Sequence, residues 1–127
     1  MDDDVGCLES VESLLEREGH SIVTATRGNE ALDVARRLRE GRQRLDLSIL
    51  DFNMPDLTGL ETFQRLELEM PGTPAIFISG NATAAMESMV RTAGARALVS
   101  KPLDAFLLRN MVREVVRDQG LGGSGVN

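Results

Sequence analysis

Asp51, Ser79 and Lys101 each lie at or just past the carboxyl end of a short apolar run that is typical of a buried strand. Open α/β sheets bind their ligands at the carboxyl ends of their strands, so we expect the three side chains to share one crevice. The acidic residues 2–4 directly precede the first predicted helix, where a further strand would end. They are expected in the same crevice.

A carboxylate cluster is costly unless a hard cation neutralises it, and carboxylate oxygens with waters suit Mg²⁺. A carboxylate beside such a cation can attack a phosphoryl group, because phosphoryl transfer needs mainly alignment and charge neutralisation. Asp51 fits the nucleophile, Lys101 supplies a positive charge, and the Ser79 hydroxyl can donate a hydrogen bond to a phosphoryl oxygen. The residue types therefore predict Mg²⁺-dependent phosphoryl transfer to Asp51.

The apolar pattern alternates between strand-like runs and helical stripes, as in βα units around a parallel sheet. Strands are predicted at 21–25, 47–50, 75–78 and 97–99. Helices are predicted before Gly19, from about 31 to 38, from 59 to Pro71, over 83–93 and after Asp104. The sequence thus predicts an α/β protein, a doubly wound parallel sheet with four strands and five helices.

Two of these helices carry positional signals. Thr58 and Glu61 have the spacing of a capping box, so the third helix should begin near Gly59, with an apolar stripe that can continue to Leu68. Asp104 can cap the last helix. The apolar positions expected to pack in that helix are Leu107, Leu108, Met111, Val112, Val115 and Val116.

Size and charge restrict the function classes. A chain of 127 residues fits one domain, placed at 1–119, and the glycine-rich residues 120–127 are expected to be a flexible tail. A net charge of -6 without a basic stripe argues against direct nucleic-acid binding. No apolar run is long enough for a membrane span and no signal peptide is visible, so we expect a cytoplasmic protein.

Five short motifs occur in a fixed order along nearly the whole chain. They are Asp2-Asp3-Asp4, Leu50-Asp51-Phe52-Asn53-Met54-Pro55, Thr58-Gly59, Ser79-Gly80 and Lys101-Pro102. Together they resemble the receiver domain of two-component response regulators, the CheY-like family. The resemblance implies a flavodoxin-like fold and a phosphorylation switch.

The same resemblance implies a role for each matching residue. Asp51 would be the phosphoacceptor, Ser79 the switch hydroxyl, and Lys101 the lysine that pairs with the phosphoryl group. The implied Mg²⁺ ligands are Asp2, Asp3, Asp51 and the main-chain carbonyl of Asn53.

The chain departs from the family pattern at two places. Receiver domains begin with an apolar strand that leads into the acidic pair, but here only Met1 precedes Asp2, so the first strand is apparently missing. Upstream residues could supply it, its two neighbours could pair directly, or chains could exchange a segment. Without the strand, we expect a weakly metal-binding or oligomeric form such as a homodimer. The other departure is Leu98, which occupies the aromatic switch position.

The sequence leaves three functions open. In the first, a sensor histidine kinase or a phosphotransfer protein phosphorylates Asp51, and an output protein reads the result on the face formed by the helix at 83–93, the strand at Leu98 and the last helix. The second is a phosphatase or phosphotransferase of the haloacid-dehalogenase type, although Asn53 stands where those enzymes usually place a second acid. The third is a receiver-like scaffold that is never phosphorylated.

Overall fold

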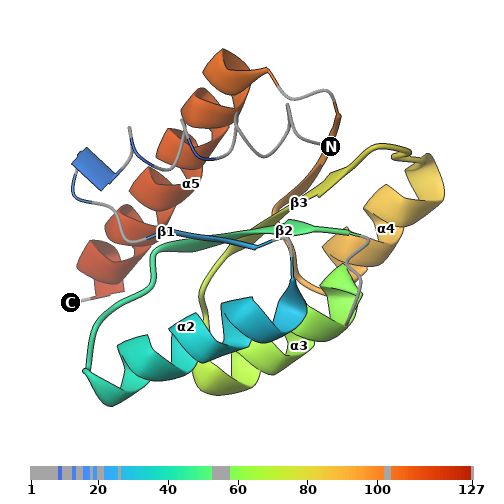
Figure 1. Cartoon of the computed structure of the whole chain (residues 1–127). Helices are drawn as coiled ribbons and strands as arrows, with labels where there is room; N and C mark the ends of the chain where they lie inside the picture. Colours follow the sequence, from blue (N-terminus) through green and yellow to red (C-terminus); the bar gives the residue numbers. More distant parts are fainter. Residues whose placement is uncertain are drawn as a thin grey trace.

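The computed structural model describes residues 9, 13, 16, 17, 19, 22–25, 27–52, 58–101 and 104–126, with the backbone alone for 23–25 and 118–126. Helices and strands alternate along the chain, as predicted (Figure 1). The elements are β1 (Ile22–Ala25), α2 (Gly28–Glu40), β2 (Leu47–Asp51), α3 (Gly59–Glu69), β3 (Ala75–Ser79), α4 (Ala84–Thr92), β4 (Ala97–Ser100) and α5 (Ala105–Val126). Of the helix expected before β1, the described residues Glu9, Ser13, Glu16 and Arg17 are helical.

The four strands form one parallel sheet in the order β1-β2-β3-β4. Strand β1 pairs directly with β2, and Ile22 lies opposite Leu47. The predicted four-stranded sheet is therefore confirmed. Among the ways of closing the sheet that the sequence left open, the described strands adopt direct pairing of the two neighbours.

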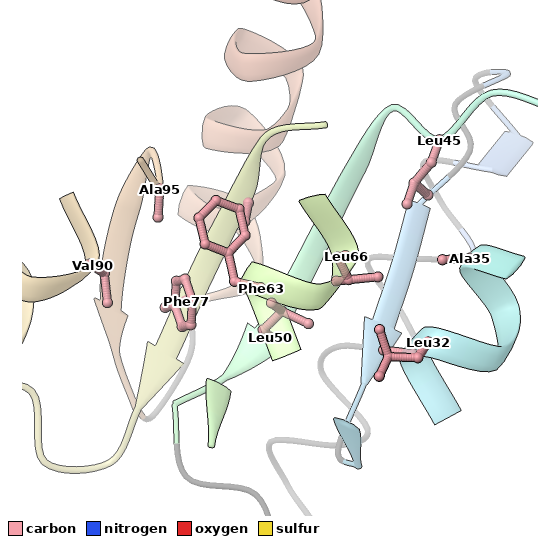
Figure 2. Packing of buried hydrophobic residues seen from close by; sticks show 11 residues of the cluster. Leu32, Ala35, Leu45, Leu50, Phe63, Leu66, Phe77, Val90 and Ala95 are labelled. Carbon is pink, nitrogen blue, oxygen red and sulfur yellow. The ribbon is translucent and has the colours of Figure 1, made fainter. Parts of the chain in front are cut away.

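Each face of the sheet is covered by a separate set of helices. Because consecutive strands lie side by side in one direction, right-handed crossovers put all the connecting helices on the same face. Buried residues of α2, α3 and α4 accordingly share one apolar cluster with Leu50 and Phe77, shown in Figure 2. On the other face, α5 packs Leu108, Val112 and Val115 against the sheet (Figure 1). The sheet is doubly wound, and β3 is buried along its whole length.

The start of α3 is fixed by the predicted capping box. The Thr58 hydroxyl oxygen accepts a hydrogen bond from Glu61 N at 3.1 Å, and Thr58 N donates to Glu61 Oε1 at 3.0 Å. The buried Thr62 hydroxyl adds a bond to the Thr58 carbonyl. Helix α3 therefore begins at Gly59, with little freedom to start elsewhere.

Two apolar positions and the C-terminal segment differ from the sequence prediction. Leu68 and Leu107 are exposed, because each lies at the margin of its helix's apolar stripe, turned away from the sheet. Helix α5 runs to Val126, so residues 120–126 continue the helix, since each added residue extends an existing helix by one hydrogen bond. Their flexibility stays a prediction. Within the described part, none of the helices combines the length and apolar character of a membrane span.

Candidate functional site

Asp51 is the last residue of β2, at the carboxyl edge of the sheet. Its Cα lies opposite Ile78 in β3, and the next residue, Phe52, donates its N–H to the Ile78 carbonyl at 2.8 Å. The strand pairing therefore continues just beyond the acidic residue. The Asp51 side chain is 19% exposed, so it is partly shielded but open to a small reactant.

Lys101 meets Asp51 across the sheet edge. Its Nζ lies 2.9 Å from Asp51 Oδ2, and the lysine side chain is 24% exposed. Its backbone N–H donates to the Ser79 carbonyl at 2.8 Å, which ties the start of the loop after β4 to the end of β3. A charge-assisted bond of this kind is stronger where solvent is partly excluded. The predicted convergence of Asp51 and Lys101 is present in the structure.

Ser79 ends β3 beside this pair and is fully buried. Its hydroxyl oxygen accepts a hydrogen bond from Asn81 N at 3.1 Å. Because the hydroxyl oxygen acts as an acceptor in this bond, its hydrogen can still be donated to another acceptor. The sequence did not indicate this contact with Asn81. Gly80 adjoins the pair, since a Cβ there would lie 3.8 Å from Lys101 Cδ.

Of the four predicted metal ligands, the structure describes only Asp51. Asp2, Asp3 and Asn53 lie outside the described residues. Within the described part no group of three potential ligand side chains gathers around one point. The donor set itself, three carboxylates and one main-chain carbonyl, consists of oxygen ligands, which is the chemistry that Mg²⁺ prefers.

The chain matches the family model described as "Response regulator receiver domain" over residues 1–113. It is 33% identical over 119 residues to the two-component response regulator ARR12 of Arabidopsis thaliana, a match that covers 94% of this chain and 19% of that protein.

Two solved structures extend the comparison. A CheY-like response regulator receiver domain protein from Methanospirillum hungatei is 26% identical with a TM-score of 0.75, covering 95% of this chain and 93% of that one. A response regulator protein from Burkholderia pseudomallei, solved with a phosphorylated aspartic acid, a calcium ion and citrate, shares the fold at 22% identity and a TM-score of 0.64, covering 95% and 71% of the two chains.

The chain therefore belongs to the response regulator receiver domain family, and its fold is the flavodoxin-like fold of that family. Receiver domains of response regulators act in phosphorylation-dependent signalling, generally as switches rather than as enzymes that turn over a substrate. The chain spans between 16% and 50% of the length of the first curated relatives it matches.

Proposed function

We propose that this domain accepts a phosphoryl group on Asp51 from a sensor histidine kinase or a phosphotransfer protein, as a step of a phosphorelay. The observation that carries the proposal is the 2.9 Å contact between Lys101 Nζ and Asp51 Oδ2, beside the buried hydroxyl of Ser79. A nucleophile, a fixed cation and a hydrogen-bond donor thus meet at one sheet edge. Those are the parts that phosphoryl transfer requires.

In the transfer, an Asp51 carboxylate oxygen forms a bond to phosphorus while the bond from phosphorus to the donor nitrogen breaks. The leaving imidazole keeps the electron pair of that bond and takes up a proton. Lys101, now beside an added anionic group, pairs with a phosphoryl oxygen, and Ser79 donates its hydroxyl hydrogen to another. The aspartyl phosphate formed in this way is the state that an output partner distinguishes.

The proposal includes a Mg²⁺ ion held by Asp2, Asp3, Asp51 and the main-chain carbonyl of Asn53. The ion would supply neutralisation of the phosphoryl charge. Support comes from the all-oxygen donor set and from the calcium ion named with the phosphorylated relative from Burkholderia pseudomallei. Lys101 supplies a single positive charge, which is too little alone to neutralise a carboxylate and a phosphoryl group together.

For output we propose the face formed by α4, β4 and α5. Large apolar side chains are exposed on two of these elements: Met89 on α4, and Phe106 and Leu107 on α5. Large apolar side chains exposed on these elements favour a protein partner or a second copy of the domain. A cytoplasmic location belongs to the proposal, because histidine kinases draw their phosphate from ATP there.

Acetyl phosphate with Mg²⁺, followed by intact mass spectrometry, tests the assignment. We expect one phosphate on the parent chain and none on Asp51→Asn, which keeps the size of the side chain but lacks the nucleophilic carboxylate. Ser48→Ala, in the same strand but within the core, is the matched control and should still be labelled. Equal labelling of Asp51→Asn and the parent would show that another residue is the acceptor.

The same experiment separates the alternatives. A phosphorylated species that persists supports the switch. Continuous release of inorganic phosphate at a catalytic rate would instead indicate a phosphatase. A parent chain that is folded, binds Mg²⁺ and takes no phosphate would indicate a scaffold.

A further inference from the structure

The backbone that carries Asp51 is in unusually close contact with the first residue of α3. A Cβ built on Gly59 would lie 2.5 Å from the Asp51 carbonyl oxygen, 2.9 Å from Phe52 Cα and 2.9 Å from the Phe77 ring. A Cβ atom essentially never approaches other atoms within 3.0 Å, so position 59 has no room for any residue except glycine. A Cβ built on Gly19, Gly41, Gly72, Gly80 or Gly94 would meet nothing nearer than 3.4 Å.

The contact is also hydrogen-bonded. Gly59 N donates to the Phe52 carbonyl at 2.9 Å, while Phe52 N donates to Ile78 in β3 at 2.8 Å. Phe52 is therefore held by the sheet through its N–H and by α3 through its carbonyl. Phe77 lies behind this peptide, with its ring edge-on to Phe52 at 6.2 Å between centroids.

We propose that Gly59 is a positioning residue for phosphoryl transfer to Asp51, because its lack of a side chain lets α3 seat on the Asp51 carbonyl and fix where the carboxylate meets Lys101. The inference rests on the proposed function. Gly59 touches no reactant, so it acts only through the backbone of Asp51 and Phe52.

An alanine at position 59 would displace the backbone at Asp51 rather than helix α3. An added methyl group must move from 2.5 Å to the 3.4 Å or more of an ordinary contact, a separation of roughly 0.9 Å. Helix α3 resists this movement, because Thr62, Phe63 and Leu66 anchor it in the core. The Phe77 ring is fully buried and cannot withdraw. Although Phe52 is hydrogen-bonded to β3 and α3, Asp51 and Phe52 are only partly buried at the end of the strand, so their peptide yields before the anchored helix and the buried ring do.

The test compares acetyl phosphate kinetics of the parent, Gly59→Ala and the control Gly41→Ala, in Mg²⁺. A shift of about 1 Å in a reacting group can cost about a hundredfold in rate, so we expect Gly59→Ala to lower the maximal phosphorylation rate constant by that order. The half-saturating donor concentration should change little, since the donor still reaches the same crevice. At Gly41 a Cβ meets nothing nearer than 3.4 Å, and its variant should match the parent.

A second variant separates positioning from packing. Phe77→Leu combined with Gly59→Ala relieves the clash with the ring but keeps the clash with the Asp51 carbonyl. In the Phe77→Leu background, Gly59→Ala should lower the melting temperature less than it does in the parent, but it should lower the rate constant as much. If Gly59→Ala loses its effect on both quantities in that background, Gly59 matters for packing against Phe77 alone and the inference is overturned.

If Gly59→Ala does not fold, Glu61→Ala is used as the test variant instead. It adds no atom and removes one hydrogen bond of the capping box that fixes the start of α3. A severalfold lower rate constant supports the inference, and an unchanged one overturns it. Failure of the proposed function is recognised separately, because the parent itself would then take no phosphate on Asp51. If Gly59→Ala is phosphorylated as fast as the parent, the proposed function stands and only the role of Gly59 is overturned.

Discussion

Helices α3 and α4 lie on the same face of the sheet and both begin after a threonine cap, yet they are held very differently. Helix α3 buries four residues, among them Phe63 and Leu66, and its cap is a reciprocal capping box. Helix α4 buries only Val90, and Thr83 caps it with a single bond to Met86 N at 3.1 Å. The strand after α4, β4, has no fully buried residue, whereas β3 has five.

The difference separates two tasks. Helix α3 contacts the backbone of Asp51, the proposed phosphoacceptor, where a displacement would slow the proposed reaction, so a rigid anchor is needed there. Helix α4 follows the loop that begins with Ser79 and Gly80, and its few core contacts make its movement inexpensive. We propose that movement of that loop and α4 reports phosphorylation in this domain, which has Leu98 in place of an aromatic ring.

The largest expected effect is on global stability. Phe63→Ala in α3 should lower the free energy of unfolding by about 3 to 5 kcal/mol, because it leaves a cavity beside Phe77. Val90→Ala in α4 should cost only about 2 kcal/mol, from two lost methyl groups and a small cavity. Urea denaturation of the two variants measures both values. A larger loss for Val90→Ala than for Phe63→Ala would contradict the comparison between the helices.

The next effect concerns the signal itself. Lys101→Ala should weaken the phosphorylation-induced change in α4, since a charge-assisted bond contributes about 1.5 to 3 kcal/mol to the state that forms it. That difference changes the population of the responding state by about tenfold or more. Amide chemical shifts of α4 with and without phosphate measure the change. Arg65→Ala, which removes an exposed charge from α3, should respond as the parent does.

Much of the site could be predicted because strand ends can be read from the sequence. The apolar runs before Asp51 and Ser79 identify the carboxyl edge, and edge position alone brings these residues and Lys101 together. The seat of Gly59 could not be predicted, because a glycine after a cap has many roles and only coordinates reveal the Asp51 carbonyl beside it.

The remaining errors have a similar cause. Helical periodicity gives the direction of an apolar stripe but not how far the facing sheet extends. Leu107, expected to pack, and Leu68, to which the stripe could continue, are therefore exposed. Direct pairing of β1 with β2 was one of several options, since local sequence does not encode which strand is a neighbour.

A smaller effect is expected at the helix caps. Thr83→Ala should lower the free energy of unfolding by about 1 kcal/mol, and Thr58→Ala by up to about 2 kcal/mol, because Thr58 belongs to a capping box. Hydrogen exchange in the first turn of each helix, together with thermal melting, measures these losses. Equal losses at both caps would mean that the reciprocal bond from Thr58 N to Glu61 contributes nothing measurable.

The smallest effect distinguishes how the two helices use ion pairs. Glu69 at the end of α3 is 17% exposed and pairs with two arginines of α2. Arg36 Nε donates a hydrogen bond to Glu69 Oε2 at 3.2 Å, and Arg39 Nη1 lies 2.9 Å from Glu69 Oε1 as a charge contact. On α4, Glu87 is 48% exposed and, among the residues that the structure describes, pairs within its own helix, with Arg91. We expect Glu87→Gln to cost about 0.3 to 0.5 kcal/mol and to lose that effect in high salt. Glu69→Gln should cost about 1 kcal/mol, because the pairing is less exposed and joins two helices. Thermal melting of both variants at low and at high salt measures these losses. If both losses vanish equally in high salt, the ion pairs between α2 and α3 are no stronger than the pair on α4.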